Sequence, residues 1–186
     1  MNQYNPETSV GNDMQLQPVG IVRNKITKPS LLAGKEGITM QGEFAERKAW
    51  IRSMSEEISE IQINEELADI LDGIEYFSHL MILYWGNMIP AHSRTLKKVH
   101  PMGREEFPLV GIFATRSPAR PNPVLLTVVR LLERRGTVLE VTGLDAVDGS
   151  PIIDIKPFVR EFYPEKDVRI AGWMQQIIDE TGQASP

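Results

Sequence analysis

A proline-rich segment between two apolar runs limits most strongly what this chain can fold into. Residues 115–123 read TRSPARPNP and hold three prolines within six positions. Each proline fixes its φ angle and lacks a backbone N–H, so the segment can be neither a helix interior nor a central strand. We therefore expect a stiff loop, called the proline loop below, between strands at residues 109–114 and 124–132.

A hairpin and a second loop follow the proline loop. The Arg134-Arg135-Gly136 tripeptide predicts a turn, and residues 137–142 alternate apolar with polar positions, which is typical of a strand. Residues 144–151, LDAVDGSP, place an Asp-Gly turn beside two carboxylates and are called the Asp-Gly loop below. A short strand is expected at residues 152–155. This order of strands and loops predicts a mainly β fold.

The chain before the proline loop adds further strands. Residues 18–23 and 59–63 have strand patterns, and residues 74–85 form the most apolar stretch, with His79 near its entry. Residues 26–38 are rich in lysine, glycine and proline and predict a loop.

Two helices are expected outside the strands. Asn64 is suited to cap a short helix that ends before Gly73. The apolar face of this helix comprises Leu67, Ile70 and Leu71. A C-terminal amphipathic helix is predicted over residues 167–180, with Asp167 at its start. Its apolar face comprises Ile170, Met174, Ile177 and Ile178.

Length and composition favour one soluble domain. With 186 residues, the chain can form one well-packed core but not two large ones. We expect a disordered tail at residues 1–17, a domain at 18–181 and a frayed end at 182–186. The absence of cysteine excludes disulfides and thiolate metal sites and fits a reducing cytoplasm. No apolar run approaches the length of a membrane span, so we predict a cytoplasmic protein without a membrane partner.

The proline loop carries the side chains best suited to binding. Arg116, Ser117, Arg120 and Asn122 would hold fixed donors toward an anionic or polar ligand. The alternative is a proline-rich turn with solvated arginines. The sequence holds three histidines, and they lack zinc-site spacing: His79, His92 and His100. We therefore expect no metal site.

The charge of the chain is unevenly distributed. The net charge is −5, but residues 90–135 hold nine basic and three acidic side chains, a local charge of +6. A basic patch on an acidic body is compatible with RNA, although an ordinary polarised surface has the same pattern. The expected RNA contacts are Arg94, Lys97, Lys98 and Arg120.

Three motifs in this order resemble one family. ATRSPARPNP, then GLDAVDGSPIIDIKP, with FSHL upstream at residues 77–80, resemble the TsaA-like or TrmO family of S-adenosylmethionine-dependent tRNA methyltransferases over residues 18–159. The resemblance implies a small antiparallel β-barrel with short helices, acting as a homodimer. The C-terminal helix would then close the barrel or brace the dimer. The implied substrate is the threonylcarbamoylated adenosine beside the tRNA anticodon, methylated on its exocyclic nitrogen.

The resemblance also assigns roles to residues. In the implied substrate the exocyclic nitrogen is part of a urea and a poor nucleophile, so we expect Asp148 or His79 to accept a proton or polarise the substrate. The implied binding site for S-adenosyl-L-methionine comprises Asn87, Met88, Arg116, Asn122, Leu126, Asp145, Ala146, Val147, Asp148 and Gly149.

Two departures from the family pattern keep other functions open. Lys28-Pro29-Ser30 stands where the family commonly has Pro-Arg-Gln, and Val124-Leu125-Leu126 stands where it has Ile-Gly-Leu. A leucine in place of glycine narrows the space beside the backbone. The alternatives are a non-catalytic ligand-binding or regulatory module, in which Leu125 fills part of the site, and a methyltransferase acting on a small molecule.

Overall fold

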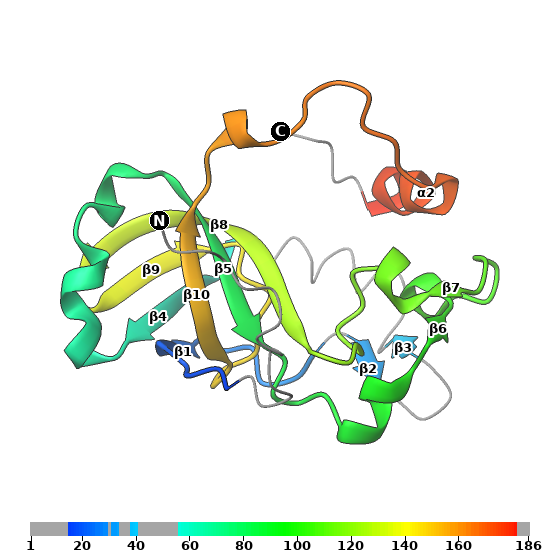
Figure 1. Ribbon diagram of the computed structural model, residues 1–186, viewed down its shortest axis with the longest axis horizontal. Coiled ribbons are helices and arrows are strands. Elements are labelled where there is room, and N and C mark those ends of the chain that lie inside the picture. Colours follow the sequence, from blue (N-terminus) through cyan, green and yellow to red (C-terminus); the bar gives the residue numbers. More distant parts are fainter. Residues whose placement is uncertain (1–14, 30, 34–37, 41–55, 182–186) are drawn as a thin grey trace, which may run out of the picture.

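The core of the protein is a closed antiparallel barrel. The computed structural model describes residues 15–29, 31–33, 38–40 and 56–181. Six strands pair around the barrel in the order β1-β10-β5-β8-β9-β4, and β4 pairs back to β1 (Figure 1). Their bounds are β1 Gly20–Arg23, β4 Ile58–Ile63, β5 His79–Trp85, β8 Val124–Arg135, β9 Val138–Thr142 and β10 Pro151–Pro157. The prediction of a mainly β barrel is confirmed.

The strand register turns alternate side chains into the barrel. Along β5, buried residues alternate with half-buried ones, so Leu80, Ile82 and Tyr84 face inward. β5 pairs with β8 from His79 opposite Arg130 to Trp85 opposite Val124. The barrel core is apolar and buries Val22, Ile61, Leu80, Ile82, Val129, Leu139, Val141, Leu144 and Ile152 to 1% exposure or less.

Barrel closure depends on a glycine in β1. A Cβ atom on Gly20 would lie 2.4 Å from the carbonyl oxygen of Gln62 on β4. The backbones of β1 and β4 therefore approach too closely for any larger residue.

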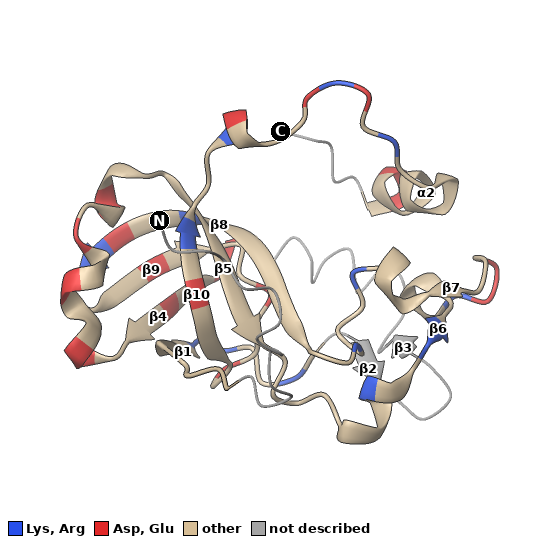
Figure 2. Cartoon of the chain, viewed as in Figure 1, with Lys and Arg blue, Asp and Glu red and all other residues tan. Residues whose placement is uncertain are grey.

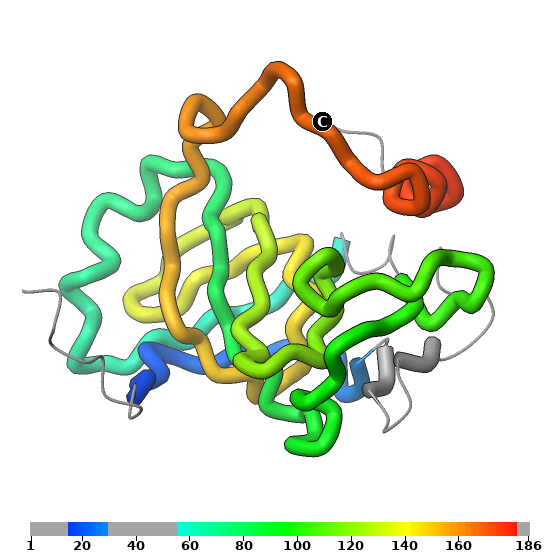
Figure 3. The backbone as a smooth tube through the Cα atoms, turned by 45° about the vertical axis from the view of Figure 1, so that its right-hand side comes forward, coloured from blue at the N-terminus to red at the C-terminus, as the bar shows by residue number. Residues whose placement is uncertain are grey.

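A small lobe lies beside one end of the barrel (Figures 1 and 3). It contains β6 (Lys98–Val99) and β7 (Val110–Gly111), with the 3-10 turns η3 (Ala91–Thr95), η4 (Pro101–Gly103) and η5 (Ile112–Ala114). Val99, Ile112 and Ala119 form its own buried core. The predicted strand at 109–114 is therefore wrong beyond β7, because Ile112 turns into this core on a 3-10 turn instead of extending a sheet.

The predicted loop at 26–38 contains one strand and the start of another. β2 (Leu31–Ala33) pairs with β3 (Ile38–Met40), and β3 contacts η4 of the small lobe. Most of the segment 42–57 lies outside the described residues, as do most of the expected N-terminal tail and the end at 182–186.

The segment before β5 is a pair of 3-10 helices, η1 (Glu65–Leu71) and η2 (Ile74–Tyr76). Asn64 occupies the N-cap position of η1 but forms no side-chain capping hydrogen bond, because its side-chain amide donates to the Pro18 carbonyl oxygen at 3.1 Å. Ile70 is 65% exposed, so the expected apolar face reduces to Leu67 and Leu71. The predicted strand at 74–85 begins only at His79.

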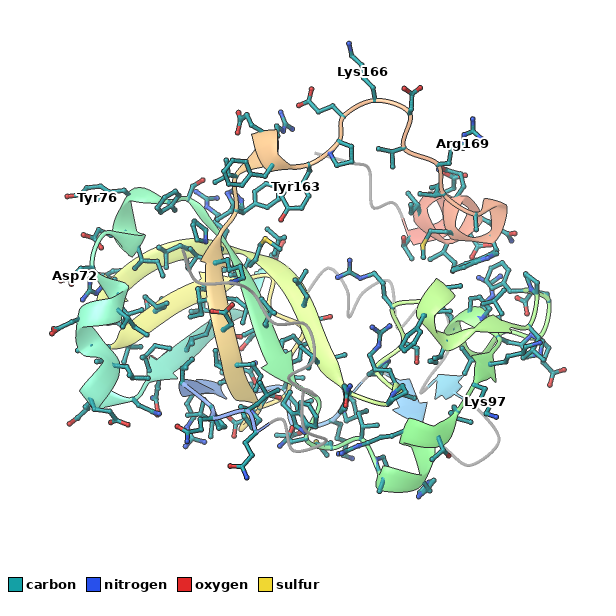
Figure 4. All side chains as sticks on the ribbon, in the orientation of Figure 1. Asp72, Tyr76, Lys97, Tyr163, Lys166 and Arg169 are labelled. Carbon is teal, nitrogen blue, oxygen red and sulfur yellow. The ribbon has the colours of Figure 1, made fainter. Side chains whose placement is uncertain are left out.

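After β10 the chain forms an arch, residues 158–171, which includes η6 (Arg160–Phe162), and then α2 (Gly172–Thr181). Asp167 has φ +61°, so the helix begins later than predicted and excludes Ile170. The arch carries α2 from the barrel to the small lobe (Figure 3), and Lys166 and Arg169 project outward from it (Figure 4).

The helix α2 packs on the small lobe. Trp173 lies 6.5 Å from Phe107 between ring centroids, and Glu180 forms an ion pair with Arg104. The barrel is closed by strand pairing, so the expectation that the helix closes it is wrong. None of the helices in the described ranges combines the length and apolarity needed to cross a membrane.

Candidate cofactor site

A cavity of about 390 Å³ lies where β5 ends and β8 begins. Its volume falls in the range of small-molecule sites, which combine apolar walls with a few fixed polar groups. Its apolar lining includes Pro29, Met88, Ile89, Val124, Leu125 and Leu126. Its polar lining includes Tyr84, Asn87, Thr115, Arg116, Arg120, Asp145 and Ser150. Both the proline loop and the Asp-Gly loop contribute.

A tight turn shapes the Asp-Gly loop. The Ser150 N–H donates to the Val147 carbonyl at 3.1 Å, and Gly149 has φ +76° at the third position of this turn. Glycine is favoured there because larger residues are strained at positive φ. The N–H groups of Asp148 and Gly149 donate to Ile26 and Val22 carbonyls. These two N–H groups therefore hold the loop to β1 and the residues after it.

Asn24, just past β1, holds the same loop from its other side. Its side-chain amide donates to the Ala146 carbonyl at 2.9 Å and to the Ser59 hydroxyl at 3.1 Å. Its amide oxygen accepts from the Ile26 N–H at 3.0 Å. Asn24 thus joins β1, β4 and the Asp-Gly loop, a role that no local sequence signal indicated.

Two hydroxyl groups fix Asp145 at the cavity. The Tyr84 phenol donates to Asp145 Oδ1 at 2.8 Å, and the Thr127 hydroxyl donates to the same oxygen. Burial, and then the negative charge of Asp145, raise the pKa of the Tyr84 phenol far above its ordinary value. Tyr84 therefore stays protonated and remains a donor.

The proline loop is braced by its own side chains, as its predicted stiffness requires. Arg120 donates through Nε to the Ser117 carbonyl at 2.9 Å and through Nη2 to the Thr115 carbonyl at 2.8 Å. Ser117 and Ala119 are buried. Arg120 lines the cavity but serves first as an internal brace.

Arg116 leaves the proline loop toward β8. Its Nη2 donates to the Leu126 carbonyl at 2.6 Å, which anchors the guanidinium at the cavity wall. A guanidinium has five N–H donors, so this single bond leaves donors for a ligand.

The structure brings six of the residues expected to bind the cofactor to the cavity lining: Asn87, Met88, Arg116, Leu126, Asp145 and Val147. Asn122, Ala146 and Gly149 lie outside the lining: Asn122 is exposed, Ala146 is buried, and Gly149 is tied to β1.

Neither residue expected to move a proton lies in the cavity lining. The Asp148 carboxylate faces β1, where it accepts from the Asn24 N–H at 3.1 Å and lies 3.9 Å from Arg23 Nη1. His79 is exposed at the start of β5, 2.9 Å from the Ser78 hydroxyl. It lies five residues before Tyr84, about 17 Å along the strand.

The two departures from the family pattern both border the cavity. Pro29 and Leu125 are part of its lining. Leu125 lies opposite Tyr84 in the β5–β8 register, and its Cδ1 would be 3.4 Å from a Cβ on Gly86. Leu125 therefore narrows the cavity without closing it.

The residues expected to contact RNA divide into fixed and exposed groups. Arg94 is half-buried, with its guanidinium 5.5 Å from the Trp85 ring centroid and bonded to the Ile89 carbonyl. Lys97 and Lys98 are exposed on the small lobe, where Figure 4 labels Lys97.

Charged residues are distributed differently over the far end of the barrel and the small lobe. Arg134 and Arg135, at the far end of the barrel, are paired with Asp72, Glu75, Glu60, Glu133 and Glu140. Figure 2 marks acidic positions along η1, β4 and β9, whereas the small lobe carries basic positions together with the acidic Glu105 and Glu106. Among the described residues, no group of three histidine, cysteine or acidic side chains could hold a metal ion.

Comparison with known proteins points to one family. The chain matches the sequence model of the tRNA-methyltransferase O N-terminal domain over residues 33–163. It is 42% identical over 149 residues to the "Probable S-adenosyl-L-methionine-binding protein" of Methanothermobacter thermautotrophicus, covering 80% of this chain and 93% of that protein. A Mus musculus protein named "tRNA (adenine(37)-N6)-methyltransferase" is 38% identical over 92 residues, covering 50% of this chain and 21% of that protein.

A solved structure shares the fold. The crystal structure of TrmO from P. aeruginosa matches with a TM-score of 0.60 at 23% identity, covering 87% of this chain and 62% of that one. The chain thus spans nearly all of its archaeal relative but only part of the solved TrmO and of the mouse protein. The family match covers most of the chain and agrees with the barrel and with the motifs of the two loops. The chain belongs to the tRNA-methyltransferase O N-terminal domain family.

Proposed function

We propose that the chain binds S-adenosylmethionine in the cavity and transfers its methyl group to tRNA. The proposed acceptor is the exocyclic nitrogen of the threonylcarbamoylated adenosine beside the anticodon. The observation that carries the proposal is the cavity itself, in which two braced loops present Arg116 and Asp145 beside apolar walls. The name of the archaeal relative supports the methyl donor, and the name of the mouse relative supports N6 of adenine 37 in tRNA as the methylated position.

The residues present fit a ligand of this kind. Leu125, Leu126 and Val124 offer an apolar surface for a nucleoside base, and Asn87 offers an amide at the same end of β5. Arg116 and Asp145 offer one positive and one negative group, which suits a zwitterionic amino-acid end. An all-apolar cavity would not suit a charged donor, because unpaired charges are costly to bury.

The chemistry needs little beyond alignment. When bound, S-adenosylmethionine supplies a methyl group that the nucleophilic nitrogen attacks in line, so that the N–C bond forms while the C–S bond breaks and its electron pair stays on sulfur. The chain contributes by fixing the geometry of donor and acceptor, which can supply much of the rate. Because Asp148 and His79 lie outside the cavity lining, we propose that the nitrogen releases its proton to water after the new bond forms.

The small lobe is the proposed docking surface for tRNA. Lys97 and Lys98 are exposed there, and the acidic end of the barrel lies opposite (Figure 2). Single Lys97→Ala and Lys98→Ala variants should each reduce the slope of log affinity against log salt by about 1, because each removes one phosphate contact. Lys156→Ala, on β10, is the matched control and should leave the slope unchanged.

The direct test is methyl transfer from labelled S-adenosylmethionine to tRNA with and without the threonylcarbamoyl group. We expect label only in the modified tRNA. Arg116→Ala should weaken donor binding at least about tenfold, because it removes a charge-assisted contact. Arg130→Ala, at the far end of β8, should not change it. Failure of the unaltered protein to bind the donor would refute the proposal.

A second candidate function is a binding module without methyl transfer. Leu125, which narrows the cavity, favours it. Donor binding without transfer to any tRNA, together with transfer gained in Leu125→Gly, would support this candidate. Transfer to a small molecule instead of tRNA would support the remaining alternative. The homodimer expected from the family is a further proposal, tested by light scattering during gel filtration.

A further inference from the structure

The mechanism above does not account for the hydrogen bonds that hold Asp145 at the cavity. Tyr84 is 4% exposed and lies at the cavity end of β5, Thr127 is half-buried on β8, and Asp145 is an exposed residue of the Asp-Gly loop. The Tyr84 and Thr127 hydroxyls both donate to Oδ1 of Asp145. Three separate parts of the chain therefore meet on one carboxylate.

The two hydrogen bonds fix the direction of the carboxylate. Neither of them uses Oδ2, and Asp145 is part of the cavity lining. A carboxylate held at one oxygen by two donors is pre-oriented and loses little freedom when its other oxygen meets a ligand.

The negative charge of Asp145 has no basic partner within the described part of the chain. No lysine or arginine there forms an ion pair with it, although Arg116 and Arg120 line the same cavity. Both arginines instead donate to backbone carbonyls of the proline loop and β8. A fixed carboxylate facing a ligand cavity without a protein cation is suited to a cation on the ligand.

We propose that Tyr84, Thr127 and Asp145 form a cation-recognition corner that binds a positively charged group of the methyl donor. This inference rests on the proposed binding of S-adenosylmethionine. Asp145 makes the contact, and Tyr84 and Thr127 are positioning residues. Two groups of the donor have the required chemistry, the sulfonium and the α-ammonium.

The identity of the cation has a functional consequence. The sulfonium loses its charge when the methyl group leaves, so a carboxylate beside it would bind the donor better than the thioether product and favour product release. The α-ammonium is unchanged by the reaction, so a carboxylate beside it would hold donor and product equally well.

The test compares three ligands by calorimetry. S-adenosylmethionine carries both cations, S-adenosylhomocysteine carries only the α-ammonium, and 5′-methylthioadenosine carries neither. Asp145→Asn should weaken the binding of S-adenosylmethionine about ten- to a hundredfold, which is the range of a charged hydrogen bond. It should change the affinity for 5′-methylthioadenosine by less than about twofold. If the variant binds S-adenosylhomocysteine more weakly to the same extent, the cation that Asp145 contacts is the α-ammonium. If its affinity for S-adenosylhomocysteine is unchanged, that cation is the sulfonium.

Tyr84→Phe and Thr127→Val test the positioning role. Each nearly keeps the side-chain volume and removes one hydrogen-bond donor to Asp145. We expect each to weaken the binding of S-adenosylmethionine about three- to tenfold and to leave the affinity for 5′-methylthioadenosine unchanged. Tyr163→Phe is the matched control, because its hydroxyl lies against the Met81 sulfur. Asp154→Asn, at an aspartate paired with Lys156 on β10, controls for charge.

The outcomes separate this inference from the function on which it rests. Loss of affinity for all three ligands together, or for none, in Asp145→Asn would overturn the cation-recognition corner while leaving donor binding by the unaltered protein intact. Absence of binding by the unaltered protein would overturn both. Thermal melting of each variant identifies a loss of affinity that results only from unfolding.

Discussion

Asn24→Ala offers the sharpest test of how the Asp-Gly loop is held. The substitution removes the amide that donates to the Ala146 carbonyl and the Ser59 hydroxyl, and the oxygen that accepts from the Ile26 N–H. Ala146 and Ser59 are each 1% exposed, so water reaches neither group freely. The variant therefore leaves two buried polar groups without this partner.

The magnitude follows from those two groups. A buried polar group left unpaired costs about 1–3 kcal/mol. Partial access of water through the space vacated by Asn24, which is itself only half-buried, lowers the sum. We expect the free energy of unfolding to fall by about 2–4 kcal/mol. At a urea slope near 2 kcal/mol/M, the unfolding midpoint should shift by about 1–2 M.

Urea unfolding followed by fluorescence measures this change. Asn64→Ala is the matched control, because it removes one hydrogen bond, to Pro18, at an exposed site. We expect a loss there below about 1 kcal/mol. Equal losses in the two variants would refute the claim that Asn24 fastens the loop. The folded fraction of Asn24→Ala should also bind S-adenosylmethionine more weakly, because the loop carries Asp145.

Three further predictions address closure, turn geometry and helix docking. Gly20→Ala places a Cβ 2.4 Å from the Gln62 oxygen and should lower the free energy of unfolding by at least about 2 kcal/mol in urea. Gly149→Ala, at φ +76°, should lower it by about 1 kcal/mol. The Arg104 hydrogen bond holds the pKa of Glu180 below its ordinary value, so the docking of α2 should be stable at neutral pH. It should be lost as the pH falls below about 4.3 and through that lowered pKa, as measured by hydrogen exchange of α2 amides.

The predictions on barrel closure and helix docking each have a control. Gly111→Ala adds a Cβ that meets nothing within 4 Å at an ordinary φ, and its unfolding midpoint should barely change. If Gly20→Ala behaves like it, the close approach of β1 and β4 does not limit the barrel. Glu180→Gln should exchange its α2 amides quickly at every pH, whereas Glu105→Gln, at an exposed position, should keep the pH dependence. A pH dependence that persists in Glu180→Gln would assign it to another group.

The fold was predictable where the pattern was local. Alternation along residues 137–142 and the apolar run that includes β5 predicted barrel strands, because one face of each strand is buried. The apolar run at 109–114 led to a wrong prediction of a strand, since Ile112 packs in the core of the small lobe and not in a sheet. The start of α2 was predicted too early because an amphipathic pattern of residues does not indicate that Asp167 has a positive φ.

The site was predictable only through its motifs. The motifs located both loops, but they do not tell which way a side chain points, and Asp148 faces Arg23 instead of the cavity. Tyr84 and Asp145 are 61 residues apart, so their hydrogen bond has no local signal. Strand alternation could have indicated that Tyr84 faces inward, because Leu80 and Ile82 precede it at the same spacing.

The closed barrel determines how other chains can approach this protein. Each of its six strands has two paired neighbours, so no strand of the barrel has an edge that is unpaired over its whole length. In the described structure, strands with one wholly unpaired edge belong to the two-stranded sheets of β2 with β3 and of β6 with β7. Edge-to-edge aggregation and strand addition are therefore blocked over most of the molecule. Recognition must occur through loops and side chains, which lets the loops around the cavity change in sequence while the barrel stays the same.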